Sequence, residues 1–307
     1  MSRIHEALKQ IAAQRQSGAP AKPSFPRPSR DGSLALDVLS SSKLGGTADP
    51  GLPPPLQDLR QYSQPGWNSG TKENVFAAAP SLCAEQFRKL RSRLYYIRNT
   101  EPVRIVQVTS ALPGEGKSFV ALNLAQAISR DRGRRVLLVD ADMRVSRLAA
   151  YLGAPGAPGL SDYLRGAAAE AAVIQTNANG SLFFVPAGDP AKNPTELLTA
   201  GRFQSLLERL APMFDWIIVD TPPVLPVSDA SVLAGACDGV LVVVRAAATG
   251  CELVEAALKE LPAAKVLGVV LNRAEEELPR GAYVYYARMA GGRPAESTGP
   301  SSRLRVR

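Results

Sequence analysis

Short apolar runs rich in β-branched residues recur through the middle of the chain. They lie at 104–110, 135–140, 181–187, 215–220, 239–245 and 266–272. Near-continuous apolar runs of this length suit strands buried on both faces of a parallel sheet. Helical stretches lie between them, among others at 119–130, 195–210 and 251–261. This alternation predicts an α/β fold with a doubly wound, mostly parallel sheet that binds its ligand beyond the carboxyl ends of the strands.

A longer helix is predicted before the first strand, in SLCAEQFRKLRSRLYYIRN at 81–99. Its apolar residues fall on one stripe at helical spacing, at Leu82, Phe87, Leu90 and Leu94. Glu85, Arg88 and Arg91, three residues apart, line the opposite side. A charged row of this kind is either a solvated face or a contact with another subunit.

The two ends of the chain lack this regular pattern. Residues 1–16 contain a short amphipathic stretch, predicted as a helix over 2–14, for which a frayed end is the alternative. Residues 17–80 are rich in Pro, Gly and Ser and predict a disordered linker. Residues 279–307 predict a flexible basic tail, so the folded domain is expected to span 81–278.

Charge and composition narrow the classes of partner. The chain has 307 residues and a net charge of +8, and six arginines against one glutamate lie from Arg280 onward. An anionic partner is therefore expected, but not a nucleic acid, because no recognisable recognition module accompanies the basic tail. The single histidine, His5, argues against His-based catalysis, and three scattered cysteines predict reduced thiols. No run approaches the ~20 apolar residues that a membrane span needs.

The segment VTSALPGEGKS joins the first apolar run to the helix that follows it. Glycines let backbone amides wrap phosphates, a lysine reaches the terminal phosphates, and a hydroxyl binds Mg²⁺, all at a helix N-terminus. Gly114, Gly116, Lys117 and Ser118 supply these groups. Ala111 stands where the strict pattern has its first glycine, so the loop alone would also suit an ordinary turn.

Aspartates follow two of the other apolar runs. VLLVDADMR places Asp140 and Asp142 after one run, and WIIVDTPP places Asp220 after another. Each one alone is compatible with a helix cap or a turn. Together, carboxylates at strand ends can reach the magnesium ion of a nucleotide held by the neighbouring loop.

These segments carry a resemblance to a known family. SALPGEGKS, LLVDADMR and IIVDTPP resemble the Walker A, A′ and B motifs of the bacterial tyrosine kinases (BY-kinases) of capsular and exopolysaccharide biosynthesis. EQFRKLRSRL resembles the family's E-x2-R-x2-R oligomerisation helix, and GLSDYLRG, NPTELL and PVSDASVLAGACDGVLVVVR occur in the family's order. The resemblance covers about 81–275 and implies a P-loop NTPase fold and an ATP-dependent protein-tyrosine autokinase.

The resemblance also implies roles for individual residues. ATP would be bound by one loop and one distant amide, at Pro113, Gly114, Glu115, Gly116, Lys117, Ser118, Phe119 and Asn272. Lys117 would hold the β- and γ-phosphates, while Ser118, Asp142 and Asp220 would organise Mg²⁺. Asp140 would be the candidate base for a tyrosine hydroxyl, and Asn272 would contact the adenine.

The expected phosphate acceptors are tyrosines near the C-terminus. GAYVYYARM places Tyr283, Tyr285 and Tyr286 just past the last predicted strand, where the family phosphorylates such a cluster in trans between subunits. An aromatic edge strand packed on its own domain is the alternative. By the same resemblance, Glu85, Arg88 and Arg91 would join subunits into a homo-oligomeric ring.

The resemblance further implies a cytoplasmic, stand-alone kinase at the inner face of the plasma membrane. Its activator would be a membrane-spanning polysaccharide co-polymerase, and a tyrosine phosphatase would reverse the modification. The helix at 2–14 is expected to dock on the co-polymerase, with the linker giving reach.

Two other functions share part of this pattern. A positioning ATPase of the MinD and ParA type has the same fold and strand-end aspartates, but such loops typically begin with a lysine where this chain has Leu112. A nucleotide-gated, non-catalytic assembly protein of a polysaccharide machine is the other alternative, against which the full set of carboxylates argues.

Overall fold

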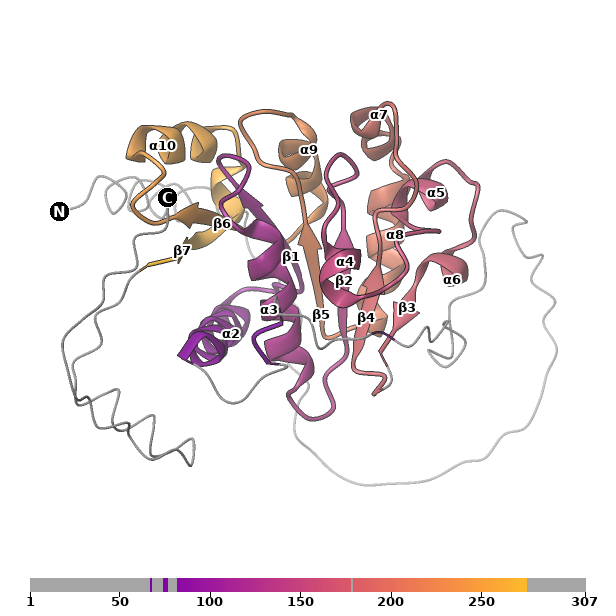
Figure 1. Cartoon of the computed structure of the whole chain (residues 1–307), viewed down its shortest axis with the longest axis horizontal. Coiled ribbons are helices and arrows are strands. Elements are labelled where there is room, and N and C mark those ends of the chain that lie inside the picture. The colour runs from indigo at the N-terminus through magenta and orange to yellow at the C-terminus, as the bar shows by residue number, and fades with distance from the viewer. Residues whose placement is uncertain (1–66, 68–73, 77–81, 178, 275–307) are drawn as a thin grey trace, which may run out of the picture.

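The computed structural model describes Trp67 and residues 74–76, 82–177 and 179–274. Within this part a single sheet has the strand order β3-β4-β2-β5-β1-β6-β7 (Figure 1). Its strands are β1 (Ile105–Ser110), β2 (Val136–Asp140), β3 (Gln175–Thr176), β4 (Leu182–Val185), β5 (Trp216–Asp220), β6 (Gly239–Arg245) and β7 (Val266–Asn272). All neighbouring strands run parallel except β3, which pairs antiparallel with β4. The predicted α/β fold with a mostly parallel sheet is confirmed.

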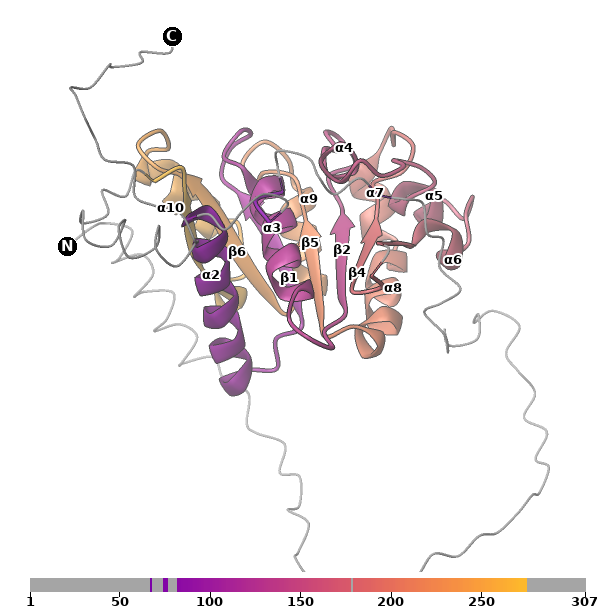
Figure 2. The ribbon, with the colours of Figure 1, turned by 60° about the horizontal axis from the view of Figure 1, so that its bottom comes forward.

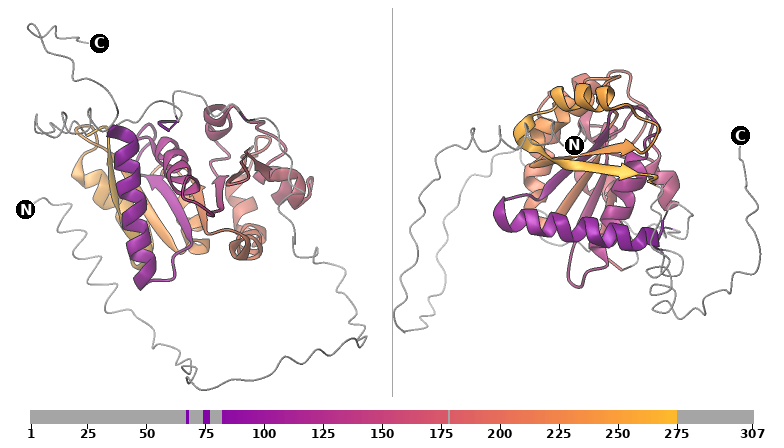
Figure 3. Two further views of the ribbon diagram at one scale, coloured as in Figure 1. Left: turned by 90° about the horizontal axis from the view of Figure 1, so that it is seen from below. Right: turned by 90° about the vertical axis from the view of Figure 1, so that its left-hand side faces the viewer.

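Helices cover both faces of the sheet. They are α2 (Leu82–Thr100), α3 (Lys117–Ser129), α4 (Leu148–Leu152), α5 (Leu160–Leu164), α6 (Glu170–Val173), α7 (Pro194–Thr199), α8 (Arg202–Leu210), α9 (Asp229–Ala236) and α10 (Cys251–Lys259). Helices α2 and α3 lie in front of the strands in Figure 2. Figure 3, right, looks at the β7 edge and shows α2 on one face of the sheet and α10 on the other.

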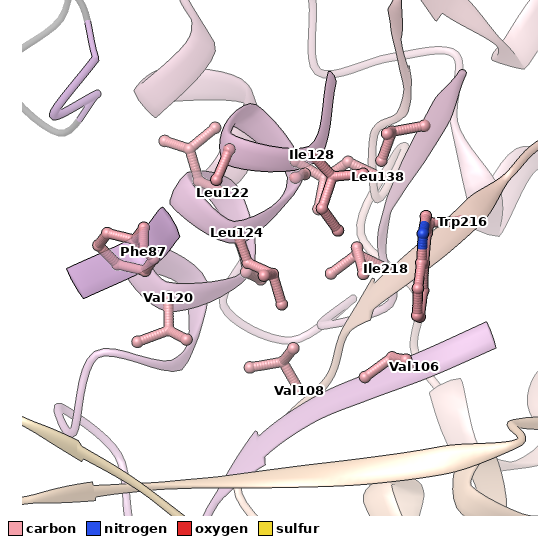
Figure 4. Close-up of a cluster of buried hydrophobic side chains, with 14 of the residues drawn as sticks. Phe87, Val106, Val108, Val120, Leu122, Leu124, Ile128, Leu138, Trp216 and Ile218 are labelled. Atoms are coloured by element: carbon pink, nitrogen blue, oxygen red, sulfur yellow. The ribbon is translucent and has the colours of Figure 1, made fainter. Parts of the chain in front are cut away.

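The strands are apolar on both sides because each side meets a different layer of helices. In β2, Leu138 joins the cluster beneath α2, α3 and α4, while Leu137 joins the cluster beneath α8. Successive side chains of a strand point to opposite faces, so a strand covered on both sides needs apolar residues at consecutive positions. Figure 4 shows the first layer, with Val108 and Ile218 from the sheet close to Leu124 of α3.

Helix α2 packs against the start of β5, at the amino end of the sheet. Tyr95 stacks on Trp216 of β5, with ring centroids 5.7 Å apart and planes 13° apart. The Arg98 guanidinium lies 4.9 Å from the centroid of the same indole and donates a hydrogen bond to the Asp215 carbonyl at 2.7 Å. Cation–π contact and stacking thus add to apolar burial, and the helix predicted at 81–99 is found at Leu82–Thr100.

Two elements differ from the prediction. The helix expected over 195–210 is two helices, α7 and α8, because Gly201 between them has a φ of 79°, a left-handed conformation that ends one helix before the next begins. Strand β3 was not predicted. It has two residues, too few for an alternating pattern to be visible in the sequence.

Four residues from the segment predicted as a linker pack on the domain. The Trp67 indole donates to the Gln175 side chain at 3.2 Å and meets the Phe184 ring edge-on at 5.9 Å. Phe76 is buried, and its carbonyl accepts a hydrogen bond from Arg130 at 2.7 Å. The linker prediction is wrong for Trp67 and residues 74–76, because two aromatic side chains find apolar surface despite the Pro- and Gly-rich composition around them.

Replacing Phe76 with alanine is expected to lower the free energy of unfolding by about 2–4 kcal/mol, because a buried ring would leave a cavity against α2 and α3. Chemical denaturation followed by fluorescence measures the loss. An exposed aromatic, Tyr96, provides the control, since its side chain is 73% exposed and its alanine variant should be nearly neutral. Equal stability of both variants would show that the segment does not pack on the domain in solution.

Candidate active site

The loop between β1 and α3 has the backbone of a phosphate cradle. Gly114 and Gly116 have φ values of 81° and 94°, and α3 begins directly after them at Lys117. Two reasons exclude a side chain at Gly116. The left-handed φ would strain any residue with a Cβ, and that Cβ would lie 2.1 Å from the Asn272 side-chain amide nitrogen. The N-terminus of α3, with no acidic residue in its first turn, leaves amide groups available to an anion.

Lys117 extends from this loop to the next strand. Its Nζ lies 2.7 Å from Asp142 Oδ2 and 3.4 Å from Ser118 Oγ, and its side chain is 12% exposed. Burial lowers the pKa of Lys117, but the charges of Asp220 and Asp142 outweigh that effect and raise it. The ammonium group therefore stays charged at neutral pH.

Asp140 and Asp220 lie side by side at the carboxyl ends of adjacent strands. They are paired in the register of β2 and β5, next to β1 and its loop. Burial, with the negative charge of Asp220, raises the pKa of Asp140 above its ordinary value. Burial also raises the pKa of Asp220, against the opposing charge of Lys117. Two buried carboxylates this close disfavour each other's ionised form.

The two carboxylates differ in their partners. Asp140 accepts hydrogen bonds from the Ser146 hydroxyl at 2.8 Å and from the Asp142 amide at 3.2 Å. Both oxygens of Asp220 are buried and have no hydrogen bond of normal geometry with any described residue, although the nearby Ser118 hydroxyl helps to lower the pKa of Asp220. In this conformation Asp140 shapes the loop after β2, whereas Asp220 presents two free acceptor oxygens to the site.

This arrangement fits a hydrated divalent cation. Among the described residues no three His, Cys, Asp or Glu side chains gather into an all-protein metal cage. Mg²⁺ does not require one, because it keeps several waters and typically binds one or two carboxylates plus substrate phosphates. Asp220 is buried without a hydrogen-bond partner among the described residues, and the charge of Lys117 compensates only part of that cost, so a second cation would stabilise it further. Ser118 and Asp142, the other two predicted ligands, lie within reach of the same Lys117 ammonium.

The remaining loop residues have separate positions. Pro113 and Gly114 are exposed at the loop, whereas the Phe119 ring packs edge-on against Phe87 of α2, 5.8 Å between centroids. Asn272, at the end of β7, donates from its side-chain amide to the Glu115 carbonyl at 2.8 Å. The structure thus brings Asn272 against the phosphate loop, while Phe119 contributes its side chain to the core.

The predicted oligomerisation residues lie on α2, away from this site. Arg88 pairs with Glu85 at 2.8 Å, and both side chains are partly exposed. Arg91 instead donates to the Ala127 carbonyl of α3 at 2.8 Å, an intramolecular contact. The predicted acceptors Tyr283, Tyr285 and Tyr286, the helix predicted at 2–14 and the predicted tail at 279–307 lie outside the described residues. None of the described helices combines the length and apolarity that crossing a membrane requires.

Sequence reasoning missed a polar cluster beside the aspartates. Arg144 pairs with the buried Asp229 of α9 at 2.7 Å, and Asp229 also accepts a hydrogen bond from Thr195 of α7. This cluster ties the loop after β2 to two helix starts. The motifs LLVDADMR, PVSDASVL and NPTELL each contain one of the three residues, but their spacing gives no sign that they meet.

The model of the CobQ/CobB/MinD/ParA nucleotide binding domain family matches residues 106–286. The chain is 37% identical over 206 residues to the putative tyrosine-protein kinase EpsB of Ralstonia nicotianae, covering 66% of this chain and 27% of EpsB. It is 34% identical over 197 residues to the tyrosine-protein kinase CpsD of Streptococcus agalactiae serotype III, covering 63% of this chain and 84% of CpsD.

A solved structure shows the same similarity to tyrosine kinases. The kinase domain of the Escherichia coli tyrosine kinase ETK matches with a TM-score of 0.59 and 32% identity over 64% of this chain and 78% of that domain. The matched part of the chain thus spans most of CpsD but only about a quarter of EpsB. With its loop, strand-end aspartates and fold in place, the chain belongs to the CobQ/CobB/MinD/ParA nucleotide-binding domain family and, within it, to the bacterial tyrosine kinases.

Proposed function

We propose that the protein transfers the γ-phosphoryl group of ATP to tyrosine hydroxyl groups. The observation that carries this proposal is the meeting of Lys117, Asp140, Asp142 and Asp220 at the carboxyl ends of β1, β2 and β5. Phosphoryl transfer depends mainly on positioning and on stabilising charge. One ammonium group and three carboxylates around a helix N-terminus are suited to that task.

Each group has a role that follows from its position. Lys117 would move from Asp142 to the β- and γ-phosphates when nucleotide binds. Its side chain is already an ammonium ion that can bind them, because Asp220 and Asp142 raise its pKa. Ser118, Asp142 and Asp220 would hold Mg²⁺, which neutralises phosphate charge. Asp140 would accept the tyrosine proton, for which a carboxylate of raised pKa at neutral pH is suited. Asn272 would lie beside the adenine from the end of β7.

The acceptor tyrosines are proposed to be Tyr283, Tyr285 and Tyr286, phosphorylated in trans. The described part of the chain ends after β7, whose last residue contacts the phosphate loop of its own subunit. The segment that follows is proposed to carry its tyrosines to the active site of a neighbouring subunit. Glu85 and Arg88 on α2 would make the subunit contact of a homo-oligomeric ring, and Arg91 would support α2 from within.

Mixing two defective chains tests the proposal. A Lys117→Met chain keeps the tyrosines but lacks activity, and a chain with Tyr283, Tyr285 and Tyr286 replaced by phenylalanine keeps activity but lacks acceptors. With Mg·ATP, the Lys117→Met chain is expected to become tyrosine-phosphorylated only in the mixture, as located by mass spectrometry. Each chain alone is the control. An unlabelled Lys117→Met chain beside an active partner would contradict phosphorylation between subunits.

The partners are proposed from the kinases that this chain is similar to. The protein would act in capsule or exopolysaccharide synthesis at the inner face of the plasma membrane, activated by a membrane-spanning co-polymerase and reversed by a tyrosine phosphatase. Residues 2–14 would dock on the co-polymerase. The +8 net charge favours an anionic membrane surface nearby.

A positioning ATPase of the MinD and ParA type is the second candidate, favoured by the matching family model, whose description includes both. Leu112 argues against it, since it stands where those loops carry a lysine that reaches a partner subunit. ATP hydrolysis without any phosphotyrosine, with the co-polymerase segment present, would favour this candidate over the kinase.

A further inference from the structure

The side chain of Glu115 is turned away from the site whose loop it belongs to. The residue stands between the two left-handed glycines of the phosphate loop, yet it is only 3% exposed. Its Oε2 accepts a hydrogen bond from the Leu112 amide at 2.7 Å. Its Oε1 accepts one from the Arg245 amide at 3.3 Å and one from the Thr249 hydroxyl. The carboxylate is therefore fully engaged.

These donors come from two separate parts of the chain. Leu112 belongs to the phosphate loop itself, whereas Arg245 and Thr249 lie 130 and 134 residues away, at the end of β6 and in the loop that follows it. The Glu115 carbonyl meanwhile accepts the Asn272 side-chain amide, at the end of β7. Glu115 thus joins the phosphate loop to the carboxyl ends of β6 and β7.

The loop needs an external support of this kind. Gly114 and Gly116 can adopt many conformations, so holding their amides in one arrangement costs conformational entropy on each binding event. The negative charge of the Glu115 carboxylate would also repel a bound triphosphate, unless the carboxylate points away from it and accepts hydrogen bonds elsewhere. Hydrogen bonds to an ionised carboxylate are stronger than neutral ones and can hold the loop in its binding form.

We propose that Glu115 is a positioning residue that holds the phosphate loop in its nucleotide-binding form through Thr249 and the Arg245 amide. The inference rests on the proposed nucleotide site and adds the β6–α10 loop to it. Thr249 is the adjustable member of this contact, because it acts through a side-chain hydroxyl while Leu112 and Arg245 act through backbone amides. Glu115 does not touch the transferred group, so its role appears in nucleotide affinity rather than in the chemical step.

The test compares variants of the full chain by calorimetric titration with Mg·ADP. Thr249→Val keeps the shape of the side chain and removes the donor, and Glu115→Gln replaces one acceptor by a donor facing N–H groups. Each is expected to weaken Mg·ADP binding about 5- to 30-fold. Thr249→Ser keeps the hydroxyl and should bind within about twofold of the parent. Glu252→Gln is the charge-matched control, since Glu252 is exposed on the adjacent helix α10.

Kinetics provide a readout that general destabilisation would not mimic. For Thr249→Val, the KM for ATP should rise by about the same factor as the Mg·ADP dissociation constant, while kcat stays within about threefold. If the parent protein binds Mg·ADP and Thr249→Val binds it equally well, the positioning role is overturned. If the parent protein binds no nucleotide, that result contradicts the proposed function instead. If Glu115→Gln does not fold, the comparison of Thr249→Val with Thr249→Ser still tests the positioning role.

Discussion

Replacing Lys117 with methionine is expected to lower the rate of tyrosine phosphorylation by about three orders of magnitude or more. Methionine has a similar length but no charge, so the β- and γ-phosphates would lose a donor that is pre-placed beside Asp142 at 2.7 Å. The loss acts on charge that develops during transfer, so kcat should fall more than nucleotide affinity does. Single-turnover phosphotyrosine formation measures it.

An exposed lysine supplies the control for this change. Lys192 lies on the surface before α7, and Lys192→Met should leave the rate within about twofold. Lys117→Met must also be shown to be folded, since Asp142 loses its ion-pair partner in that variant. A folded Lys117→Met protein with near-parental activity would exclude Lys117 from the reaction and would remove the basis of the proposed function.

Replacing Asp220 with asparagine is expected to lower activity at least about 100-fold while raising the stability of the nucleotide-free protein. Both oxygens of this buried carboxylate lack hydrogen-bond partners among the described residues. Its neutral replacement avoids a desolvated charge, which should raise the free energy of unfolding at pH 7.5 by on the order of 1–3 kcal/mol. Lys117 loses the favourable charge of Asp220 but keeps its ion pair with Asp142 at 2.7 Å, so its ammonium group is not left unpaired.

The pH dependence of this effect has a definite sign. Burial raises the pKa of Asp220, so between its ordinary value and the raised one the folded state binds more protons than the unfolded state. Ionisation of Asp220 therefore lowers stability as the pH rises through that interval. The advantage of Asp220→Asn should accordingly be large at pH 7.5 and small below about pH 4.

Thermal unfolding of both proteins across this pH range, with phosphotyrosine assays alongside, measures the two effects together. Asp238→Asn is the contrasting control, because Asp238 Oδ2 accepts backbone amide hydrogen bonds from Arg104 at 2.8 Å and from Ile105 at 2.7 Å. That variant should lose stability. If Asp220→Asn loses stability too, the carboxylate has partners in the nucleotide-free protein and is not reserved for a cation.

Much of the site could be predicted because it depends on local pattern. The strands around the site are apolar runs: Asp140 and Asp220 end two of them, Asp142 follows two residues later, and Lys117 begins the helix after the phosphate loop. Carboxyl ends of parallel strands meet at one edge of a sheet, so the sequence alone predicts that these groups gather there. The helix at Leu82–Thr100 was visible for the same reason, since its apolar stripe repeats over several turns.

Other features depended on contacts between distant segments. Nothing near Glu115 indicates that its carboxylate reaches Thr249, 134 residues away, or that Asn272 closes over Gly116. Phe76 lies in a stretch whose composition predicts a linker, yet it enters the core. Such pairings are set by how side chains of different segments fit together, and no periodicity of one segment encodes them.

The sequence by itself thus determined the sheet, the phosphate loop and the acidic groups beside it, because each follows from residues adjacent in the chain. Only the tertiary structure decided which of those carboxylates has hydrogen-bond partners. Asp140 and Asp142 take part in the loop after β2, while Asp220 is left with two free oxygens. The physical reason is burial: a polar group removed from water depends on the few donors that the fold places within its reach.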